Sequence, residues 1–355
     1  MSINFGQSVS LKQAANAIAN NPELRYFLQG EPGIGKSSIM KLIGERKPEH
    51  FKSYMDCSQL DLGDIAMPVV NRELGVTEYY PNSRFGMHTG EPVLMMLDEF
   101  TKAAEPVKNM LHPLLESSNP RLGDISVHPE SIIFATGNLS SDGVGDTLKA
   151  HTRNRIVPLH VRKPDSEEWL EWAVLNDIDG VVMAWVHQYP HALASYTDEG
   201  QEGNPYIFNP KKVQTAFVSP RSLERASHIL KSRDNLDHET QIAALTGAIG
   251  EAGARDMQAY VEYQDQLPTW EAIMKDPEGV DVPPSAGACY VLVFGAIHKI
   301  DKQNVETFFK YLNRFEPEWQ AVFCVNLAKS PDKKEIAFQA KAFADWAEQN
   351  QDIID

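Results

Sequence analysis

The sequence has no long apolar segment and few cysteines. No hydrophobic run approaches the roughly 18 residues typical of a membrane-spanning helix, so we expect no membrane span. The first residues show neither the basic stretch nor the apolar stretch of a secretory signal, which predicts a cytoplasmic protein. The three cysteines, Cys57, Cys289 and Cys324, are far apart and form no C-x-x-C pair, so we expect reduced and mostly buried thiols.

The sequence also lacks a dense cluster of lysine and arginine. The formal net charge is −16, whereas a protein that binds a nucleic-acid backbone usually has a basic patch that neutralises phosphates. Small groups such as Lys211-Lys212 remain, and an assembly of several copies would concentrate them. We therefore expect protein partners, and nucleic acid stays a less favoured alternative.

What is present is the composition of an ordinary globular protein. The hydrophobic content of 42% and the charged content of 23% are typical of this class, and 355 residues are enough for about two or three domains. His187 and His191 have a spacing that would bind a metal on a helix, but Pro190 would break that helix, so we expect a loop without metal.

The most informative motif is a phosphate-binding loop, G-x-x-x-x-G-K-[ST], between a strand-like run (26–28) and a helix-like run (38–43). In such a loop backbone N–H groups surround phosphate oxygens, Lys36 neutralises the β- and γ-phosphates, and the Ser37 hydroxyl completes a Mg²⁺ shell at the positive end of the helix. A glycine-rich turn without a ligand is the alternative. The residues expected at the nucleotide are Gly30, Glu31, Pro32, Gly33, Ile34, Gly35, Lys36, Ser37 and Ser38.

A second motif is the apolar run 93–97 followed by Asp98 and Glu99. A continuous apolar run is typical of a buried parallel strand, and ligands of open α/β sheets bind at the carboxyl ends of such strands. We expect Asp98 to hold the metal and Glu99 to act as the general base for water. A solvated helix cap is the alternative for an isolated acidic pair, but it is disfavoured after a phosphate loop.

A third strand-like run, 131–136, ends in Gly137-Asn138. We expect the Asn138 amide, one strand from the acids, to orient the attacking water near the γ-phosphate. A simple Gly-Asn turn is the competing interpretation. The order along the chain, phosphate loop, acidic strand and polar strand end, favours the functional one.

In this order the motifs resemble those of the AAA+ ATPases, and within them the MoxR-like group. The phosphate loop is similar to Walker A, the segment 97–103 to Walker B with its following helix, and 135–138 to sensor 1. Two departures weaken the assignment to a subgroup: Phe100-Thr101-Lys102 stands where the group more often has Ile-Asn-Arg, and Ile156 stands where Phe is usual.

Two further segments extend the resemblance to arginines. Thr152-Arg153-Asn154-Arg155-Ile156 is similar to the segment with the arginine finger, with Arg155 at the matching position and Arg153 as the alternative. A pair of ordinary surface cations before a strand (157–161) is the competing interpretation. Ser219-Pro220-Arg221-Ser222 resembles the start of the sensor 2 helix, which implies that Arg221 is a second arginine at the nucleotide.

The resemblance covers about residues 1–250 and implies a fold. It is an AAA+ αβα sandwich with a parallel sheet, followed by an α-helical lid and a helical C-terminal extension. We expect the nucleotide-binding core at 1–164, the lid with sensor 2 at 165–250 and the extension at 251–355. In the lid we expect a helix opened by a capping-box signal at 165–170, buried aromatic residues and a surface excursion at 188–217.

In the extension, the spacing of apolar residues predicts helices over 254–263, 302–312 and 337–343. Nothing in its sequence indicates its chemistry. We expect it to dock on the lid, to cover a neighbouring subunit or to bind a partner.

The family's finger comes from the next subunit, so the resemblance implies a homo-oligomeric ring, usually a hexamer. It further implies that Mg-ATP hydrolysis drives remodelling or activation of a protein client. MoxR-like ATPases commonly act with a partner that has a von Willebrand factor A domain. A nucleic-acid motor or loader and a nucleotide-gated ring scaffold are the alternative functions.

The region between the first two motifs is also informative. The stretch 57–92 is rich in Gly, Pro, Asn and Tyr and predicts a long functional loop. In the family, an insertion there faces the pore or a partner, and Tyr79 and Tyr80 are the candidate contacts, unless they pack on their own loop. The family's second insertion, a hairpin, corresponds to 119–128.

Overall fold

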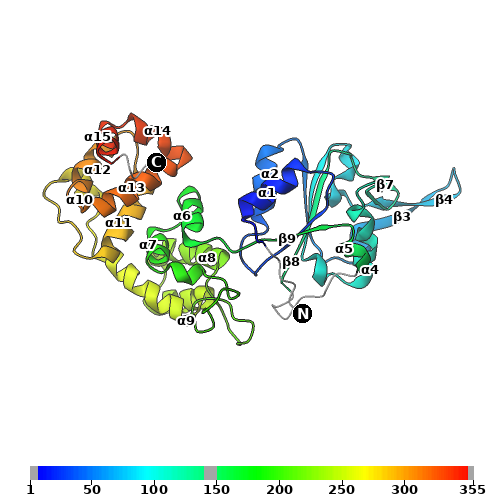
Figure 1. The fold of residues 1–355 in the computed structure, drawn as a ribbon, viewed down its shortest axis with the longest axis horizontal. Helices are drawn as coiled ribbons and strands as arrows, with labels where there is room; N and C mark the ends of the chain where they lie inside the picture. The colour runs from blue at the N-terminus through cyan, green and yellow to red at the C-terminus, as the bar shows by residue number, and fades with distance from the viewer. Residues whose placement is uncertain (1–6, 140–149, 351–355) are drawn as a thin grey trace. The chain divides into compact units, whose positions relative to one another are not determined.

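The computed structural model describes residues 7–139 and 150–350, and the chain divides into two compact units, Met1–Lys163 and Pro164–Asp355 (Figure 1). The first unit is α/β, and the described part of the second contains helices and no strands. None of the helices in the described ranges has the combination of length and hydropathy that crossing a bilayer requires.

The first unit is built on a five-stranded parallel sheet with the order β2-β5-β8-β1-β9. Its strands are β1 (Tyr26–Gln29), β2 (Phe51–Asp56), β5 (Val93–Asp98), β8 (Ile132–Gly137) and β9 (Val157–His160). Its α-helices are α1 (Leu11–Asn20), α2 (Ser38–Arg46), α3 (Leu62–Ile65), α4 (Glu105–Leu111) and α5 (Ala150–Arg153). The expected α/β fold with a parallel sheet is therefore confirmed.

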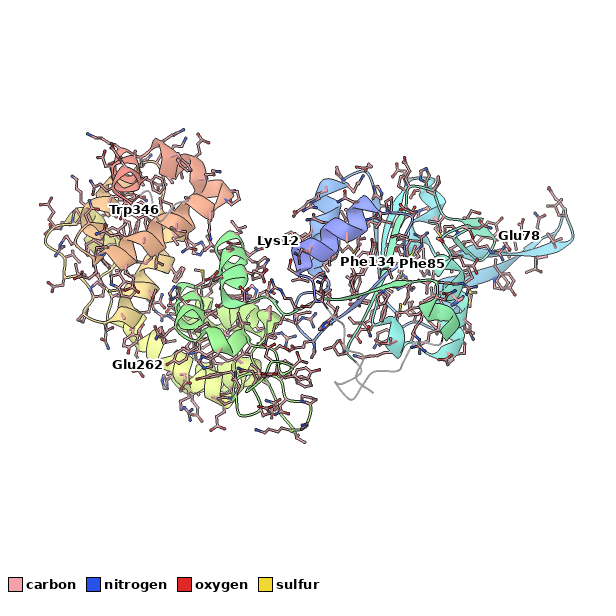
Figure 2. All side chains as sticks on the ribbon, viewed as in Figure 1. Lys12, Glu78, Phe85, Phe134, Glu262 and Trp346 are labelled. Carbon is pink, nitrogen blue, oxygen red and sulfur yellow. The ribbon has the colours of Figure 1, made fainter. Side chains whose placement is uncertain are left out.

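Helices and turns cover both faces of this sheet, which explains the buried apolar runs of its inner strands β5 and β8. Because side chains alternate along a strand, Leu94 and Met96 of β5 pack with α1 and α2, whereas Met95 and Leu97 pack with α4 and the turns around it. Figure 2 labels one phenylalanine from each of these two clusters, Phe134 and Phe85.

Two antiparallel hairpins extend this unit. They are β3 (Ala66–Asn71) with β4 (Val76–Pro81), and β6 (Arg121–Leu122) with β7 (Ile125–Ser126). The second hairpin was expected. The first corrects the prediction of a long loop at 57–92: β-branched and aromatic residues form strands on both sides of a turn that Gly75 closes with a φ of 67°.

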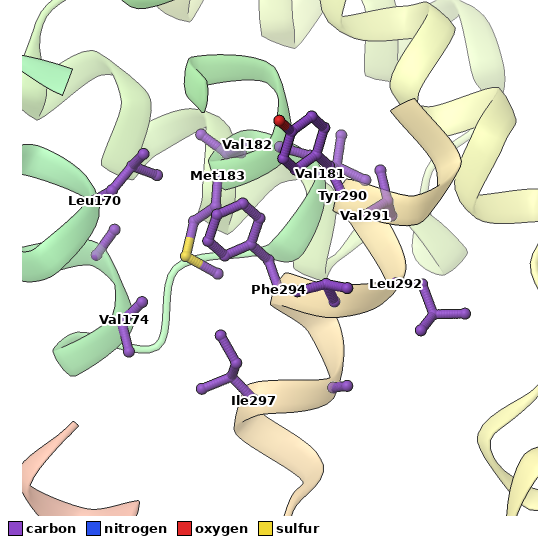
Figure 3. Packing of buried hydrophobic residues seen from close by; sticks show 14 of the residues in the cluster. Leu170, Val174, Val181, Val182, Met183, Tyr290, Val291, Leu292, Phe294 and Ile297 are labelled. Atoms are coloured by element: carbon purple, nitrogen blue, oxygen red, sulfur yellow. The ribbon is translucent and has the colours of Figure 1, made fainter. Parts of the chain in front are cut away.

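The second unit has one hydrophobic core, which extends from Trp169 to Trp346. Its helices are α6 (Ser166–Leu175), α7 (Gly180–Gln188), α8 (Pro220–Lys231), α9 (His238–Asp265), α10 (Trp270–Lys275), α11 (Ala286–Lys299), α12 (Val305–Leu312), α13 (Pro317–Lys329), α14 (Pro331–Gln339) and α15 (Lys341–Gln349). Figure 3 shows the packing of α7 against α11. These helices approach closely at Gly180, where a Cβ would lie 2.9 Å from the Gly295 nitrogen.

The helices expected over 254–263 and 302–312 are present within α9 and as α12, and Trp169 and Trp185 are buried as expected. The predicted capping box is also present, with Asp165 as the N-cap of α6, because its carboxylate accepts from the Glu168 N–H. The apolar run 337–343 is not one helix but breaks at Ala340, because Glu306 Oε1 accepts from the Lys341 N–H at 2.6 Å and starts a new helix there.

Two further features concern the predicted boundaries in this unit. Helix α9 crosses residue 250, where its backbone is interrupted at Gly250 (φ 81°). The three-part domain division stays a prediction. Helix α7 ends before Pro190, and the following stretch to residue 217 has only the short 3-10 helix η6 (Pro190–Leu193).

Candidate nucleotide-binding site

The phosphate loop connects β1 to α2, and its backbone explains its glycines. Gly33 and Gly35 have φ values of 76° and 98°, which most other residues adopt only with strain. At Gly30 a Cβ would lie 2.5 Å from the Val161 carbonyl oxygen, so a side chain has no room there. Ile34 is fully buried and anchors the loop. The sequence therefore forms a tight loop at the carboxyl end of β1.

The side chain of Lys36 is buried and crosses the inside of this loop. Its Nζ donates to the carbonyl oxygens of Gly30 at 2.7 Å and Glu31 at 2.9 Å, and to Asn138 Oδ1 at 3.2 Å. The ammonium group is thus held at the carboxyl edge of the sheet by the loop itself and by the end of β8.

The first residues of α2 differ in what their hydroxyls do. Ser38 donates to the carbonyl oxygen of Gly35 at 2.7 Å and closes the loop. Ser37, at the N-cap position, makes no side-chain capping bond. Because its hydroxyl does not cap the helix, Ser37 is the better placed of the two to serve as a ligand.

The acidic pair follows β5 at the same sheet edge. Asp98 Oδ1 accepts a short hydrogen bond from Thr136 Oγ1, and Asp98 Oδ2 accepts from the Tyr54 hydroxyl at 2.7 Å. Glu99 has a left-handed backbone with φ 52° and ψ 34°, which costs about 1 kcal/mol or more for a residue with a Cβ. Its N–H donates to Thr136 Oγ1 at 3.2 Å.

The carboxylate of Glu99 forms an ion pair with Lys102. The 3-10 helix η3 (Phe100–Lys102) turns the chain back, so that Lys102 Nζ contacts Glu99 Oε2. The two side chains are 33% and 27% exposed. Lys102 therefore neutralises the residue expected to act as the base.

The residues at this edge suit Mg²⁺. Asp98 and Ser37 offer carboxylate and hydroxyl oxygens, the hard ligands that Mg²⁺ prefers. The described residues contain no group of three or more His, Cys, Asp and Glu side chains that would hold a metal. Mg²⁺ in nucleotide sites is usually held by one or two carboxylates together with substrate phosphates, so this donor set fits.

The candidate arginine finger lies near the amino ends of the strands, whereas the phosphate loop lies at their carboxyl ends. Val157 starts β9 level with Tyr26, the first residue of β1, whereas the phosphate loop follows the last residue of β1. Four residues of strand, about 13 Å, therefore separate the level of Arg155 from that of the loop in one chain.

Arg155 has partners of its own near the amino ends of the strands. Its guanidinium contacts the His112 ring at 2.9 Å and Glu116 Oε1 at 3.2 Å, beside a hollow of about 420 Å³. Arg153 is exposed. The two arginines thus differ in their contacts, because Arg155 binds His112 and Glu116.

Arg221 belongs to the second unit. It lies in the first turn of α8, whose N-cap Ser219 forms a reciprocal capping box with Ser222. The side chain of Arg221 is exposed. Its role at the nucleotide stays a prediction.

The structure thus brings Lys36, Asn138 and the acidic pair to one edge of the sheet. Sequence reasoning missed Thr136 and Tyr54, whose hydroxyls contact Asp98, and Glu116, which contacts Arg155. A signal for Thr136 was present, because it directly precedes Gly137-Asn138 on the strand next to β5.

Comparisons with known proteins give only distant matches. No protein-family model matches the chain, and no curated protein matches its sequence. An ATPase candidate from Cytophaga hutchinsonii is 13% identical, with a TM-score of 0.33 over 68% of this chain and 80% of that one. NtrX from Brucella abortus with ADP is 12% identical, with a TM-score of 0.35 over 97% and 67%.

A third similar structure is Hsp104 with ATPγS and casein. It is 17% identical, with a TM-score of 0.35 over 48% of this chain and 36% of the Hsp104 chain. This chain therefore matches only about a third of Hsp104. At these identities and scores none of the three similarities carries an argument about function.

Proposed function

We propose that this chain is an ATPase of the AAA+ type. The observation that carries the proposal is the contact of Lys36, in a phosphate-binding loop, with Asn138 at the end of β8, one strand from Asp98 and Glu99. A phosphate-binding cation, a metal ligand, a candidate base and a polar amide thus occupy the carboxyl edge of a parallel sheet, where such folds bind ligands.

The chemistry follows from these positions. Lys36 and the loop N–H groups bind the β- and γ-phosphates, and Mg²⁺ held by Ser37 and Asp98 would neutralise their negative charge. Glu99 accepts a proton from a water that Asn138 orients. The water oxygen bonds to the γ-phosphorus while the bond from phosphorus to the β–γ bridging oxygen breaks, and ADP leaves with the electron pair.

In this proposal, the ion pair between Glu99 and Lys102 belongs to the state before ATP binds. Glu99 must leave Lys102 to accept the water's proton, because its Oε2 is in contact with the Lys102 ammonium. We therefore expect ATP binding to separate the two, as the Lys102 ammonium is attracted to the arriving phosphates.

Arg155 acts on a neighbouring subunit's nucleotide in this proposal. The separation of about 13 Å along β1 places it away from its own loop. The Arg155 guanidinium would therefore stabilise charge on the γ-phosphoryl group of another copy, which requires an oligomer such as a ring.

The finer assignment is a MoxR-like ATPase that remodels or activates a protein client, with a von Willebrand factor A domain partner. Its support is the motif resemblance together with the β3–β4 hairpin, which projects from the first unit (Figures 1 and 2). This hairpin exposes large apolar side chains, as a client-contacting element would. The exposed residues are Met67, Val69, Val70, Leu74, Val76, Tyr79 and Tyr80.

The test combines ATP hydrolysis with particle mass. Wild-type protein should release phosphate from Mg-ATP, and Glu99→Gln should bind ATP without turnover. Light scattering on Glu99→Gln should show a shift to a defined oligomer, about six subunits, when ATP is added. Phosphate release by Glu99→Gln at the wild-type rate would contradict the proposal.

The stimulating partner separates the candidate functions. Stimulation of hydrolysis by a protein partner supports the client model. Stimulation by DNA with a steep salt dependence would replace it with a nucleic-acid motor. A Glu99→Gln variant that assembles and keeps full biological activity would instead indicate a scaffold.

A further inference from the structure

A single hydroxyl group connects both acidic residues of the site. Thr136 is fully buried near the end of β8. Its Oγ1 donates to Asp98 Oδ1 and accepts from the Glu99 N–H at 3.2 Å. The hydroxyl thus donates to the last residue of β5 and accepts from the residue that follows it.

The Glu99 backbone gives this contact its importance. Glu99 adopts a left-handed conformation that residues with a Cβ rarely take unless their surroundings fix it. Since the direction of a side chain follows from its own φ and ψ, the hydrogen bond to the Glu99 N–H helps to set where the carboxylate points. Asp98 depends less on Thr136, because Tyr54 holds its other oxygen at 2.7 Å.

The surroundings of Thr136 keep its hydroxyl in place. The next residue, Gly137, has no room for a side chain, because a Cβ would lie 2.7 Å from the Phe27 ring and 3.1 Å from Thr101 Oγ1. The end of β8 is therefore closely packed, and it also carries Asn138, which contacts Lys36. A shift of β8 would therefore change its contacts with the phosphate loop and with the acidic pair at the same time.

We infer that Thr136 is the positioning residue of this site, which aims the Glu99 carboxylate at the attacking water through the Glu99 backbone. This inference rests on the proposed ATPase function. Thr136 touches neither ATP nor water in it. Loss of the hydroxyl therefore lowers kcat and leaves ATP affinity little changed, because the phosphate loop is intact.

The experiment compares two matched pairs in the 355-residue chain, wild type with Thr136→Val and Thr136→Ser with Thr136→Ala. Thr136→Val keeps the side-chain shape and removes the hydroxyl, so we expect kcat to fall about 100-fold, as for a misplaced catalytic group. Thr136→Ser and Thr136→Ala both lose the methyl group but differ in the hydroxyl, so the serine variant should keep most of the rate and the alanine variant should lose it. This second pair stands in if Thr136→Val does not fold.

Ser131→Ala is the matched control. It removes a buried hydroxyl just before β8 that accepts from the Val93 N–H at 2.9 Å, at the start of β5 and away from the acidic pair, so its kcat should stay near the wild-type value. ATP affinity is measured separately by titration with a non-hydrolysable ATP analogue. Circular dichroism melting shows which variants are folded.

Three results would overturn the inference. They are a Thr136→Ala variant as fast as Thr136→Ser, a hydroxyl-free variant whose loss lies in ATP affinity and not in kcat, and a Ser131→Ala variant as slow as Thr136→Val. Lys36→Ala and Glu99→Gln in the same assay test the ATPase function on its own. If those two hydrolyse ATP like the wild type, the proposed function fails whatever Thr136 does.

Discussion

The ammonium group of Lys36 lies 3.2 Å from Oδ1 of Asn138, a residue 102 positions further along the chain. Lys36 follows β1 and Asn138 follows β8, and these two strands are neighbours in the sheet. The contact therefore joins the phosphate loop to the strand that also touches the acidic pair. In the proposed function, it links the groups that bind the triphosphate to those that act on it.

Lys36→Ala should abolish measurable ATP binding, because the ammonium is the buried positive charge inside the loop. Titration with a fluorescent ATP analogue measures this. Lys41→Ala is the matched control, since Lys41 lies on the same helix α2 but is exposed. Normal affinity in Lys36→Ala would remove the basis for the phosphate-loop assignment.

Lys102→Met should raise the basal rate of hydrolysis, because it frees the Glu99 carboxylate from its ion pair. The pair is partly exposed and worth about 1 kcal/mol or less, so the increase should be about fivefold at most. Lys108→Met is the control, since Lys108 also pairs with a glutamate three residues away, Glu105, but on α4. A large loss of rate in Lys102→Met would instead make Lys102 a direct contributor to catalysis.

The three cysteines should not react with a thiol reagent in the folded protein. Burial raises the pKa of Cys57, Cys289 and Cys324 above the usual range, so their thiols stay protonated at neutral pH, where only the thiolate reacts. Ellman's reagent should find no free thiol in native protein and all three in denaturant. Rapid reaction of one native thiol would contradict the packing around it.

Gly123→Ala should disrupt the contact between the β6–β7 hairpin and the β3–β4 hairpin. At Gly123 (φ 57°) a Cβ would lie 2.3 Å from the carbonyl oxygen of Tyr79, where Asp124 now makes two hydrogen bonds to the Tyr79 backbone. We expect faster proteolytic cleavage within β3–β4. Gly75→Ala is the control, because Gly75 also has a positive φ but nothing lies within 4 Å of its added Cβ. Equal cleavage of the two variants would mean that the positive φ, and not the clash with Tyr79, causes the effect.

The central sheet was predictable because its signals are local. The apolar run 93–97 and the phosphate loop each specify a structure from adjacent residues. The β3–β4 hairpin was missed because both of its faces are exposed, so its strands show no alternation of apolar and polar residues. A composition rich in turn formers then suggested a loop.

The features that the sequence did not predict depend on contacts between residues far apart along the chain. The apolar spacing over 337–343 continues through Ala340, and the break depends on Glu306, which lies 35 residues before Lys341. Thr136 likewise acts on residues 37 and 38 positions away. Such pairings depend on tertiary packing, which a local pattern does not report.

The most direct test of a site completed by a neighbouring copy is a mixture of two inactive variants. Glu99→Gln lacks the base but keeps Arg155, and Arg155→Ala lacks the finger but keeps Glu99; alone, each should lose hydrolysis about 1,000-fold or more while still binding ATP. The two are co-expressed with different tags and purified through both tags in turn, so that every particle contains both. Arg153→Ala measured alone beside Arg155→Ala identifies which arginine acts, because only the variant without the finger should lose hydrolysis.

We predict that particles with Glu99→Gln and Arg155→Ala regain hydrolysis, because some sites combine Glu99 of one copy with Arg155 of the next. Particles that stay as inactive as the separate variants would contradict a catalytic arginine contributed by another subunit.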